Sequence, residues 1–185
     1  MNFCRVACAV LLVLCGPAVA SQSISTEPGG QSYTFVSHFE KTIDAPVGDV
    51  WPILTDLSSW MNEFELSHVS GEPGEEGAVM RLYPEQEFYI QLTQIIPNRL
   101  LAITNLPSTF QGEQSTGVGV ILVHEAHGKT KVSITLSRRY TWNGEGENPI
   151  KAHRQSGVFQ ENTRAMWEDR FLGNLKTLSE AASQE

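Results

Sequence analysis

The stretch TIDAPVGDVWPILTDLSSW, residues 42–60, passes from a strand pattern to a helix pattern within a few positions. Ala45-Pro46 ends the strand pattern, because proline has no amide hydrogen to donate and a fixed φ. A one-sided helix follows, with apolar side chains at the i, i+3, i+4 and i+7 positions: Val47, Val50, Trp51 and Leu54. Pro52 keeps this helix short or kinked, and residues 57–64 can form a second short helix.

Strand patterns lie on both sides of this stretch, and a helix pattern closes the chain. Alternating residues predict a long first strand from Tyr33 to Ile43. The later strands are expected at residues 78–83, 88–96, 99–104, 118–126 and 130–140, with a loop at 111–117. Residues 155–182 have the pattern of one long amphipathic helix. The order predicts an α+β fold. A curved antiparallel sheet of about seven strands carries two short helices after strand one and a long C-terminal helix across its concave face.

The first 20 residues have the features of an export signal. Arg5 supplies a positive charge, an apolar run follows, and Ala18-Val19-Ala20 is a small-residue cleavage site. The apolar run stops at Gly16-Pro17, short of the ~20 residues that span a bilayer. Residues 1–20 are therefore predicted to be removed. The mature protein is expected to be periplasmic or secreted, without a stable membrane anchor, and residues 21–32 to form a flexible leader before a single domain at 33–185.

The charge of the chain excludes some classes of partner. It has 13 Lys and Arg against 21 Asp and Glu, a formal net charge of −8. Nucleic-acid binding needs clustered basic side chains, so no nucleic-acid partner is expected. All three cysteines lie within the predicted signal, so the mature chain has no thiol for a disulfide or a cysteine-based site.

The opening stretch also resembles a known family. Its segments Ile43-Asp44-Ala45-Pro46, Val50-Trp51, Leu54-Thr55-Asp56 and Trp60 are similar to the N-terminal signature of the START-like, or SRPBCC, superfamily. This superfamily includes polyketide cyclase/dehydrase-like and lipid-transport proteins, and the resemblance extends from about Tyr33 to Ala182. It implies a helix-grip fold, in which Val50 and Trp51 seal the gap between helix and sheet. It also implies a cavity between the sheet and the long helix.

Two motifs look like metal or phosphate sites but do not have the required spacing. The histidines of His124-Glu125-Ala126-His127 are three apart at the end of a strand, whereas the HExxH zinc motif needs them four apart on a helix. Gly117-Val118-Gly119-Val120 lacks the lysine and the spacing of a phosphate loop, and glycines within a strand mark a bend or bulge. No metal and no cofactor is expected.

A few polar residues are candidates for contact with a ligand. Either arginine of Arg138-Arg139-Tyr140 could bind a carboxylate at the cavity mouth, with Tyr140 as a hydrogen-bond donor; alternatively the segment is a solvated strand end. His38, Glu40 and Arg81 could point into the cavity or lie on the solvent face of the sheet.

The preferred hypothesis is that the domain binds a hydrophobic small molecule or lipid between sheet and helix, without catalysis. The residues expected to line this cavity are Phe88, Ile90, Leu92, Val132, Ile134, Leu136, Met166 and Phe171. One alternative is a cyclase or hydrolase type of enzyme that uses Arg81, His38 or Tyr140 as acid or base. Another is an interaction module whose core is completely filled.

Overall fold

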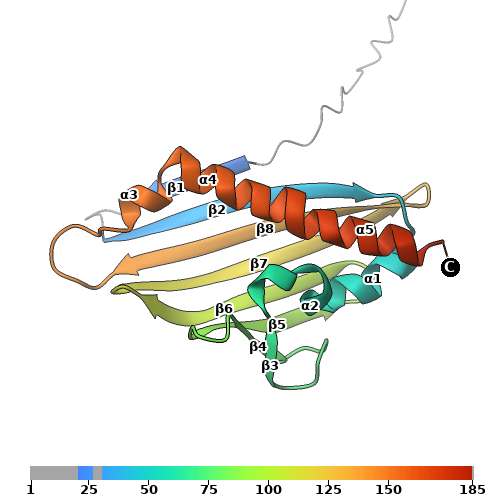
Figure 1. Ribbon diagram of the computed structural model, residues 1–185, viewed down its shortest axis with the longest axis horizontal. Coiled ribbons are helices and arrows are strands. Elements are labelled where there is room, and N and C mark those ends of the chain that lie inside the picture. Colours follow the sequence, from blue (N-terminus) through green and yellow to red (C-terminus); the bar gives the residue numbers. More distant parts are fainter. Residues whose placement is uncertain (1–20, 27–30, 185) are drawn as a thin grey trace, which may run out of the picture.

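The computed structural model describes residues 21–26 and 31–184, which form one curved, unclosed antiparallel sheet covered by helices on its concave face (Figure 1). The strand order is β1-β2-β8-β7-β6-β5-β4-β3. The strands are β1 (Ser21–Thr26), β2 (Ser32–Ile43), β3 (Ser67–Ser70), β4 (Val79–Leu82), β5 (Phe88–Ile96), β6 (Leu100–Phe110), β7 (Glu113–Ala126) and β8 (Lys129–Trp142). The predicted α+β helix-grip architecture is confirmed, with eight strands in place of about seven.

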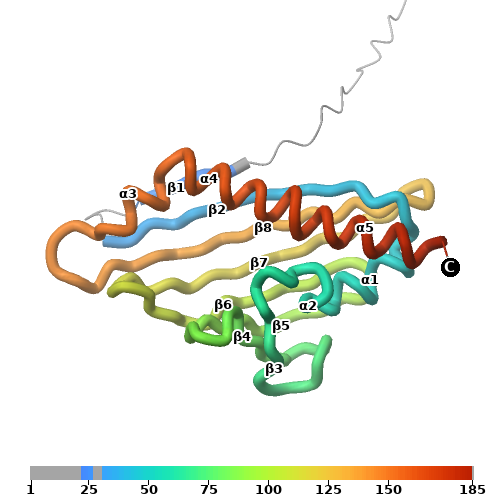
Figure 2. The backbone as a smooth tube through the Cα atoms, in the orientation of Figure 1, coloured from blue at the N-terminus to red at the C-terminus, as the bar shows by residue number. Residues whose placement is uncertain are grey.

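The helices form two groups. After β2 come α1 (Val47–Thr55), α2 (Leu57–Trp60) and the short 3-10 turn η1 (Asn62–Phe64), which cover one end of the sheet (Figure 1). After β8 come α3 (Lys151–Arg154), α4 (Gly157–Arg164), the π-helical segment η2 (Ala165–Phe171) and α5 (Leu172–Ala182). Figure 2 shows α4, η2 and α5 as one continuous path across the concave face. This path is the long C-terminal helix predicted for residues 155–182.

The long helix begins where a serine caps it. Ser156 has extended backbone angles, and its Oγ accepts a hydrogen bond from the amide of Phe159 at 3.2 Å. Such a contact satisfies one of the amide groups that the first turn of a helix leaves without a partner. The helix therefore starts at Gly157, two positions after the predicted start.

Residues of β2 alternate strictly between the two faces of the sheet. Tyr33, Phe35 and Phe39 point to the concave side and are buried. On the convex side, His38 Nδ1 lies 3.0 Å from Thr135 Oγ1, and Glu40 pairs with Lys131 at 2.8 Å. Successive side chains of a strand point to opposite faces of the sheet, so His38 and Glu40 lie on the outer face because Phe35 and Phe39 lie on the concave one.

The first six residues after the predicted cleavage site form a strand instead of a flexible leader. Each residue of β1 pairs with β2, from Ser21↔His38 to Thr26↔Tyr33. Ile24 packs against a small buried cluster, and the Gln22 amide donates to the carbonyl of Gln160 at 3.1 Å. The polar composition of β1 hid this pairing, because a strand at a sheet edge gains its hydrogen bonds from its neighbour. The predicted signal, residues 1–20, lies outside the described residues.

The loop predicted at residues 111–117 is a two-residue turn. Gln111 and Gly112 have positive φ values of 50° and 84°, as hairpin turns that match the twist of the strands require. Strand β6 therefore ends at Phe110, later than predicted, and β7 begins at Glu113, earlier than predicted.

The buried apolar side chains form two clusters. The larger one lies where α1, α2, η1 and α5 pack on the sheet and includes Trp60, Phe64 and Phe171. The smaller one consists of Tyr33, Phe35 and Tyr140, with Ile24 and Phe159 packed against it. None of the helices in the described part of the chain has the length and hydropathy needed to cross a membrane.

Candidate functional site

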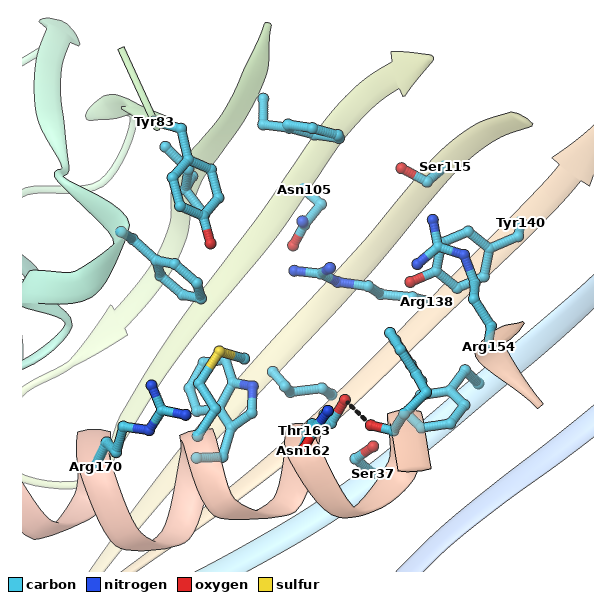
Figure 3. A pocket seen from close by; sticks show the side chains of 18 residues that line it. Ser37, Tyr83, Asn105, Ser115, Arg138, Tyr140, Arg154, Asn162, Thr163 and Arg170 are labelled. Carbon is cyan, nitrogen blue, oxygen red and sulfur yellow. Dashed lines mark hydrogen bonds between the residues drawn. The ribbon is translucent and has the colours of Figure 1, made fainter. Parts of the chain in front are cut away.

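A pocket of about 500 Å³ lies between the concave face of the sheet and the long helix, and both apolar clusters contribute to its wall (Figure 3). The sheet and its connections supply Phe35, Ser37, Phe64, Leu82, Tyr83, Phe88, Asn105, Ser115, Leu136, Arg138 and Tyr140. The C-terminal helices supply Arg154, Phe159, Asn162, Thr163, Met166, Trp167 and Arg170. Asn162 and Arg170 are also exposed to solvent, so the pocket opens beside the helix.

Three of the eight residues predicted to line the cavity do so: Phe88, Leu136 and Met166. The other five belong instead to the closely packed core: Ile90, Leu92, Val132, Ile134 and Phe171. Their strand residues point to the concave side, as predicted. However, α1, α2, η1 and α5 fill the space above that half of the sheet. The alternation of apolar and polar residues in a strand shows which face of the sheet a side chain is on. It does not show which part of that face the helices cover.

The segment Arg138-Arg139-Tyr140 divides between the two faces of β8. Arg138 and Tyr140 line the pocket, whereas Arg139 is on the opposite, solvent-exposed face. Arg81 precedes Leu82, which lines the pocket, and is itself absent from the lining. Of the polar candidates from the sequence, the structure thus brings Arg138 and Tyr140 to the pocket and leaves His38, Glu40 and Arg81 outside it.

A row of three residues crosses the floor of the pocket from β8 to β6. Arg138 pairs with Gly117, and Gly117 pairs with Asn105. A Cβ atom on Gly117 would lie 2.8 Å from Arg138 Cγ and 2.7 Å from the carbonyl oxygen of Ser137. Only glycine leaves room there for the arginine side chain to lie across β7. The glycines noted in the sequence therefore provide space on the concave face.

Tyr83 lies in the turn after β4, on the Asn105 side of this row (Figure 3). Its φ is +60°, an uncommon value for a residue other than glycine, and its amide donates to the carbonyl of Phe64 at 2.8 Å. The ring of Phe64 packs edge-on against it with centroids 5.5 Å apart. Burial raises the pKa of the Tyr83 hydroxyl, so the group is a neutral hydrogen-bond donor in ordinary buffers.

A buried carboxylate closes the end of the pocket near the 143–150 loop. Glu113 is 1% exposed and accepts hydrogen bonds from Tyr33 Oη at 2.7 Å, Asn148 Nδ2 at 2.6 Å and Arg154 Nε at 2.8 Å. The Arg154 guanidinium also lies 4.2 Å from the ring centre of Tyr140. Burial, with the neighbouring Glu113, raises the pKa of Tyr33 far above its usual value. The sequence pattern predicted a loop at Glu113, because the three partners of this residue are distant in the chain.

The helix above the pocket departs from α-helical geometry where it faces the pocket. Met166, Trp167 and Arg170 of η2 all line the pocket. The π-helical turn widens the helix locally, and such turns frequently occur at functional sites. Arg170 extends to the rim, where its Nη1 pairs with Glu63 at 2.6 Å.

Two further polar features are a buried serine in the pocket and the histidines near the end of β7. Ser37 is 1% exposed, and its Oγ has no hydrogen-bond partner among the described residues, although it lines the pocket. The described ranges contain no group of three or more metal-ligating side chains. His124 is exposed near the end of β7, and His127 lies in the turn that follows β7.

Comparison with known proteins identifies the fold. No protein-family model matches the chain, and no curated protein matches it. Solved structures do match. SA2116 from Staphylococcus aureus, a protein of unknown function, is 11% identical, with a TM-score of 0.59 over 84% of this chain and 99% of that one. CV1439 from Chromobacterium violaceum is 15% identical, with a TM-score of 0.53 over 78% and 96%. Ara h 8.0201 is 15% identical, with a TM-score of 0.50 over 82% and 99%. At these identities the likeness concerns the fold alone, which is the helix-grip fold.

Proposed function

We propose that this START-like helix-grip protein binds a hydrophobic small molecule or lipid in the pocket between its sheet and its long helix. The observation that carries the proposal is a pocket of about 500 Å³ with a wall of aromatic and aliphatic side chains, between two closely packed clusters. Ligand sites are typically clefts of ~300–1,000 Å³ with mostly apolar walls and a few polar groups. Ser37 Oγ and Arg138 are such groups here.

The lining favours binding over catalysis. Among the described residues, the pocket wall contains no histidine, aspartate, glutamate or lysine. General acid-base catalysis uses a group whose pKa is near the working pH, most often histidine or a carboxylate. Tyr140 is the one acid-base candidate from the sequence that lines the pocket, and the Arg154 guanidinium covers its ring. The presence of the pocket also argues against a completely filled core.

Export is the second part of the proposal. Its support is the arrangement of residues 1–20, with Arg5, an apolar run and Ala18-Val19-Ala20. We expect the mature protein to begin at Ser21 and to act outside the cytoplasm. N-terminal sequencing of protein recovered from the periplasm or the medium checks this, and recovery of the intact N-terminus inside the cell contradicts it.

Two threonines of the long helix allow a matched test of binding. Thr163 Oγ1 donates to the carbonyl four residues earlier at 2.8 Å and lines the pocket. Thr177 Oγ1 makes the same kind of bond at 3.0 Å, but on the exposed side of α5. Thr163→Phe fills part of the pocket, so it is expected to weaken binding of the neutral fluorescent probe N-phenylnaphthylamine about tenfold or more. Thr177→Phe is expected to leave binding unchanged.

Fluorescence titration of the wild type and both variants measures these affinities. Solvent extraction and mass spectrometry of the purified protein identify any hydrophobic molecule that it carries. The proposal is wrong if the wild type neither carries such a molecule nor binds the probe. It is also wrong if Thr163→Phe and Thr177→Phe bind the probe equally well.

A further inference from the structure

One of the three positive charges in the pocket wall is not balanced by a carboxylate of the described residues. Three arginines line the pocket, and two of them have carboxylate partners: Arg154 pairs with Glu113 at 2.8 Å and Arg170 with Glu63 at 2.6 Å. The side chain of Arg138 has no ion pair and no hydrogen bond to another residue in the described part of the chain. The chain as a whole has a formal net charge of −8, so this positive site runs against the overall charge.

The side chain of Arg138 is directed along the floor of the pocket. Its stem passes over Gly117, where a Cβ atom would come within 2.8 Å of Arg138 Cγ. Figure 3 shows its guanidinium beside Asn105, with the hydroxyl of Tyr83 on the same side of the pocket. Burial raises the pKa of the Tyr83 hydroxyl, and the positive charge of Arg138 acts in the opposite direction.

These three side chains offer hydrogen-bond donors to one region. A guanidinium carries five N–H donors and is always charged, an asparagine amide carries two, and a protonated tyrosine carries one. A half-buried guanidinium gains most from a planar anion, because carboxylate and phosphate oxygens accept parallel charge-assisted hydrogen bonds. The remaining wall near them is apolar, with Phe88, Leu136 and Met166.

We propose that the ligand is an amphiphile with one acidic group, a carboxylate or a phosphate, which binds Arg138, Asn105 and Tyr83 while its apolar part fills the rest of the pocket. The inference rests on the proposed function and specifies its ligand class. The floor row Arg138–Gly117–Asn105 is the feature that determines this specificity, because glycine at position 117 lets the arginine reach across the strand.

Titration calorimetry of the wild type with three probes tests the inference. Dodecanoate and dodecyl phosphate carry the two candidate acidic groups, and dodecanol has the same apolar chain with no charge. The wild type is expected to bind at least one of the two anions about tenfold or more tightly than dodecanol. The stronger of the two identifies the acidic group.

Arg138→Gln removes the charge at the site, whereas Arg139→Gln removes the same charge from the neighbouring position on the outer face of β8. Arg138→Gln is expected to lose the preference for the anion over dodecanol and to keep its affinity for dodecanol. Arg139→Gln is expected to retain the preference. Circular dichroism of both variants verifies that they are folded, and Arg138→Met, which also removes the charge and keeps an unbranched side chain, serves in place of Arg138→Gln if the latter unfolds.

The outcomes separate this inference from the proposed function. If the wild type binds dodecanol or N-phenylnaphthylamine but shows no preference for either anion, the acidic-ligand inference is wrong and the pocket function stands. The inference is also wrong if Arg138→Gln retains the preference. If the wild type binds none of the four probes and carries no hydrophobic molecule, both proposals are wrong.

Discussion

At the scale of single residues, one buried carboxylate holds together three segments that are distant in the sequence. Glu113 at the start of β7 accepts hydrogen bonds from β2, from the 143–150 loop and from α3, through Tyr33, Asn148 and Arg154. Every oxygen of the carboxylate has a donor, which offsets the cost of burying a charge. The network closes one end of the pocket, since Arg154 lines it.

Removing this carboxylate is expected to destabilise the protein strongly. Glu113→Ala leaves the Arg154 guanidinium, which is 17% exposed, without its ion-pair partner. The free energy of unfolding should fall by about 3–5 kcal/mol, as when one partner of a buried ion pair is removed. Urea denaturation measures the change, and hydrogen exchange should show faster opening of residues 143–156.

The exposed pair at the other end of the pocket serves as the control. Glu63 is 40% exposed and pairs with Arg170, which is 54% exposed. Glu63→Ala should change stability by less than about 1 kcal/mol, the usual range for surface ion pairs. Equal losses in Glu113→Ala and Glu63→Ala would contradict the role assigned to Glu113.

At the scale of elements, the short helices after β2 decide where the pocket is. They fill the space above one half of the sheet, so the pocket under the long helix lies over the other half. Trp60 of α2 is completely buried, its Nε1 donates to the carbonyl of Leu54 at 3.1 Å, and its ring packs edge-on against Phe171. Trp51 of α1, expected from the sequence to seal the gap, is only partly buried at the edge of the core.

The two tryptophans should therefore differ in their effect on stability. Trp60→Ala is expected to lower the free energy of unfolding by about 3–5 kcal/mol, because it leaves a large cavity between α2 and the long helix. Trp51→Ala is expected to cost less, because its side chain still contacts solvent in the folded protein. Chemical denaturation of both variants checks the order. A larger loss for Trp51→Ala would show that Trp60 is not the main contact of these helices.

At the scale of the whole molecule, the open sheet has two edges that differ in their protection. β1 covers the long strand β2, and β3 at the opposite edge is only four residues long. A long uncovered strand would present a row of unpaired N–H and C=O groups to other chains. The first residues after the predicted cleavage site therefore protect the sheet.

Deletion of residues 1–30 should uncover β2, in contrast to deletion of residues 1–20. The shorter protein loses the β1 ladder and the contact of Ile24 with the Tyr33 cluster. We expect a stability loss on the order of 2 kcal/mol, or about 4–8 °C in Tm, together with aggregation. Thermal unfolding and light scattering measure both effects. Equal Tm values for the two proteins would contradict a structural role for β1.

The sequence by itself determined the fold and the faces of the strands. The change at residues 42–60, the alternation in the strands and the periodicity of residues 155–182 predict the helix grip in the correct order. They succeed because alternation and helical periodicity are local properties that follow directly from backbone geometry. For His38 and Glu40 the sequence left two alternatives, the cavity and the solvent face, and the structure has them on the solvent face.

Only the tertiary structure decided the position and the charge of the pocket. Which half of the sheet the short helices fill, and hence why Phe88 lines the pocket while Ile90 does not, depends on packing between distant segments. The same is true of partners: Glu113 meets Arg154 across 41 positions of the chain, whereas Arg138 lies over Gly117 and has no carboxylate partner among the described residues. Local patterns cannot contain this information, because a side chain's partner is set by the register and curvature of the whole sheet.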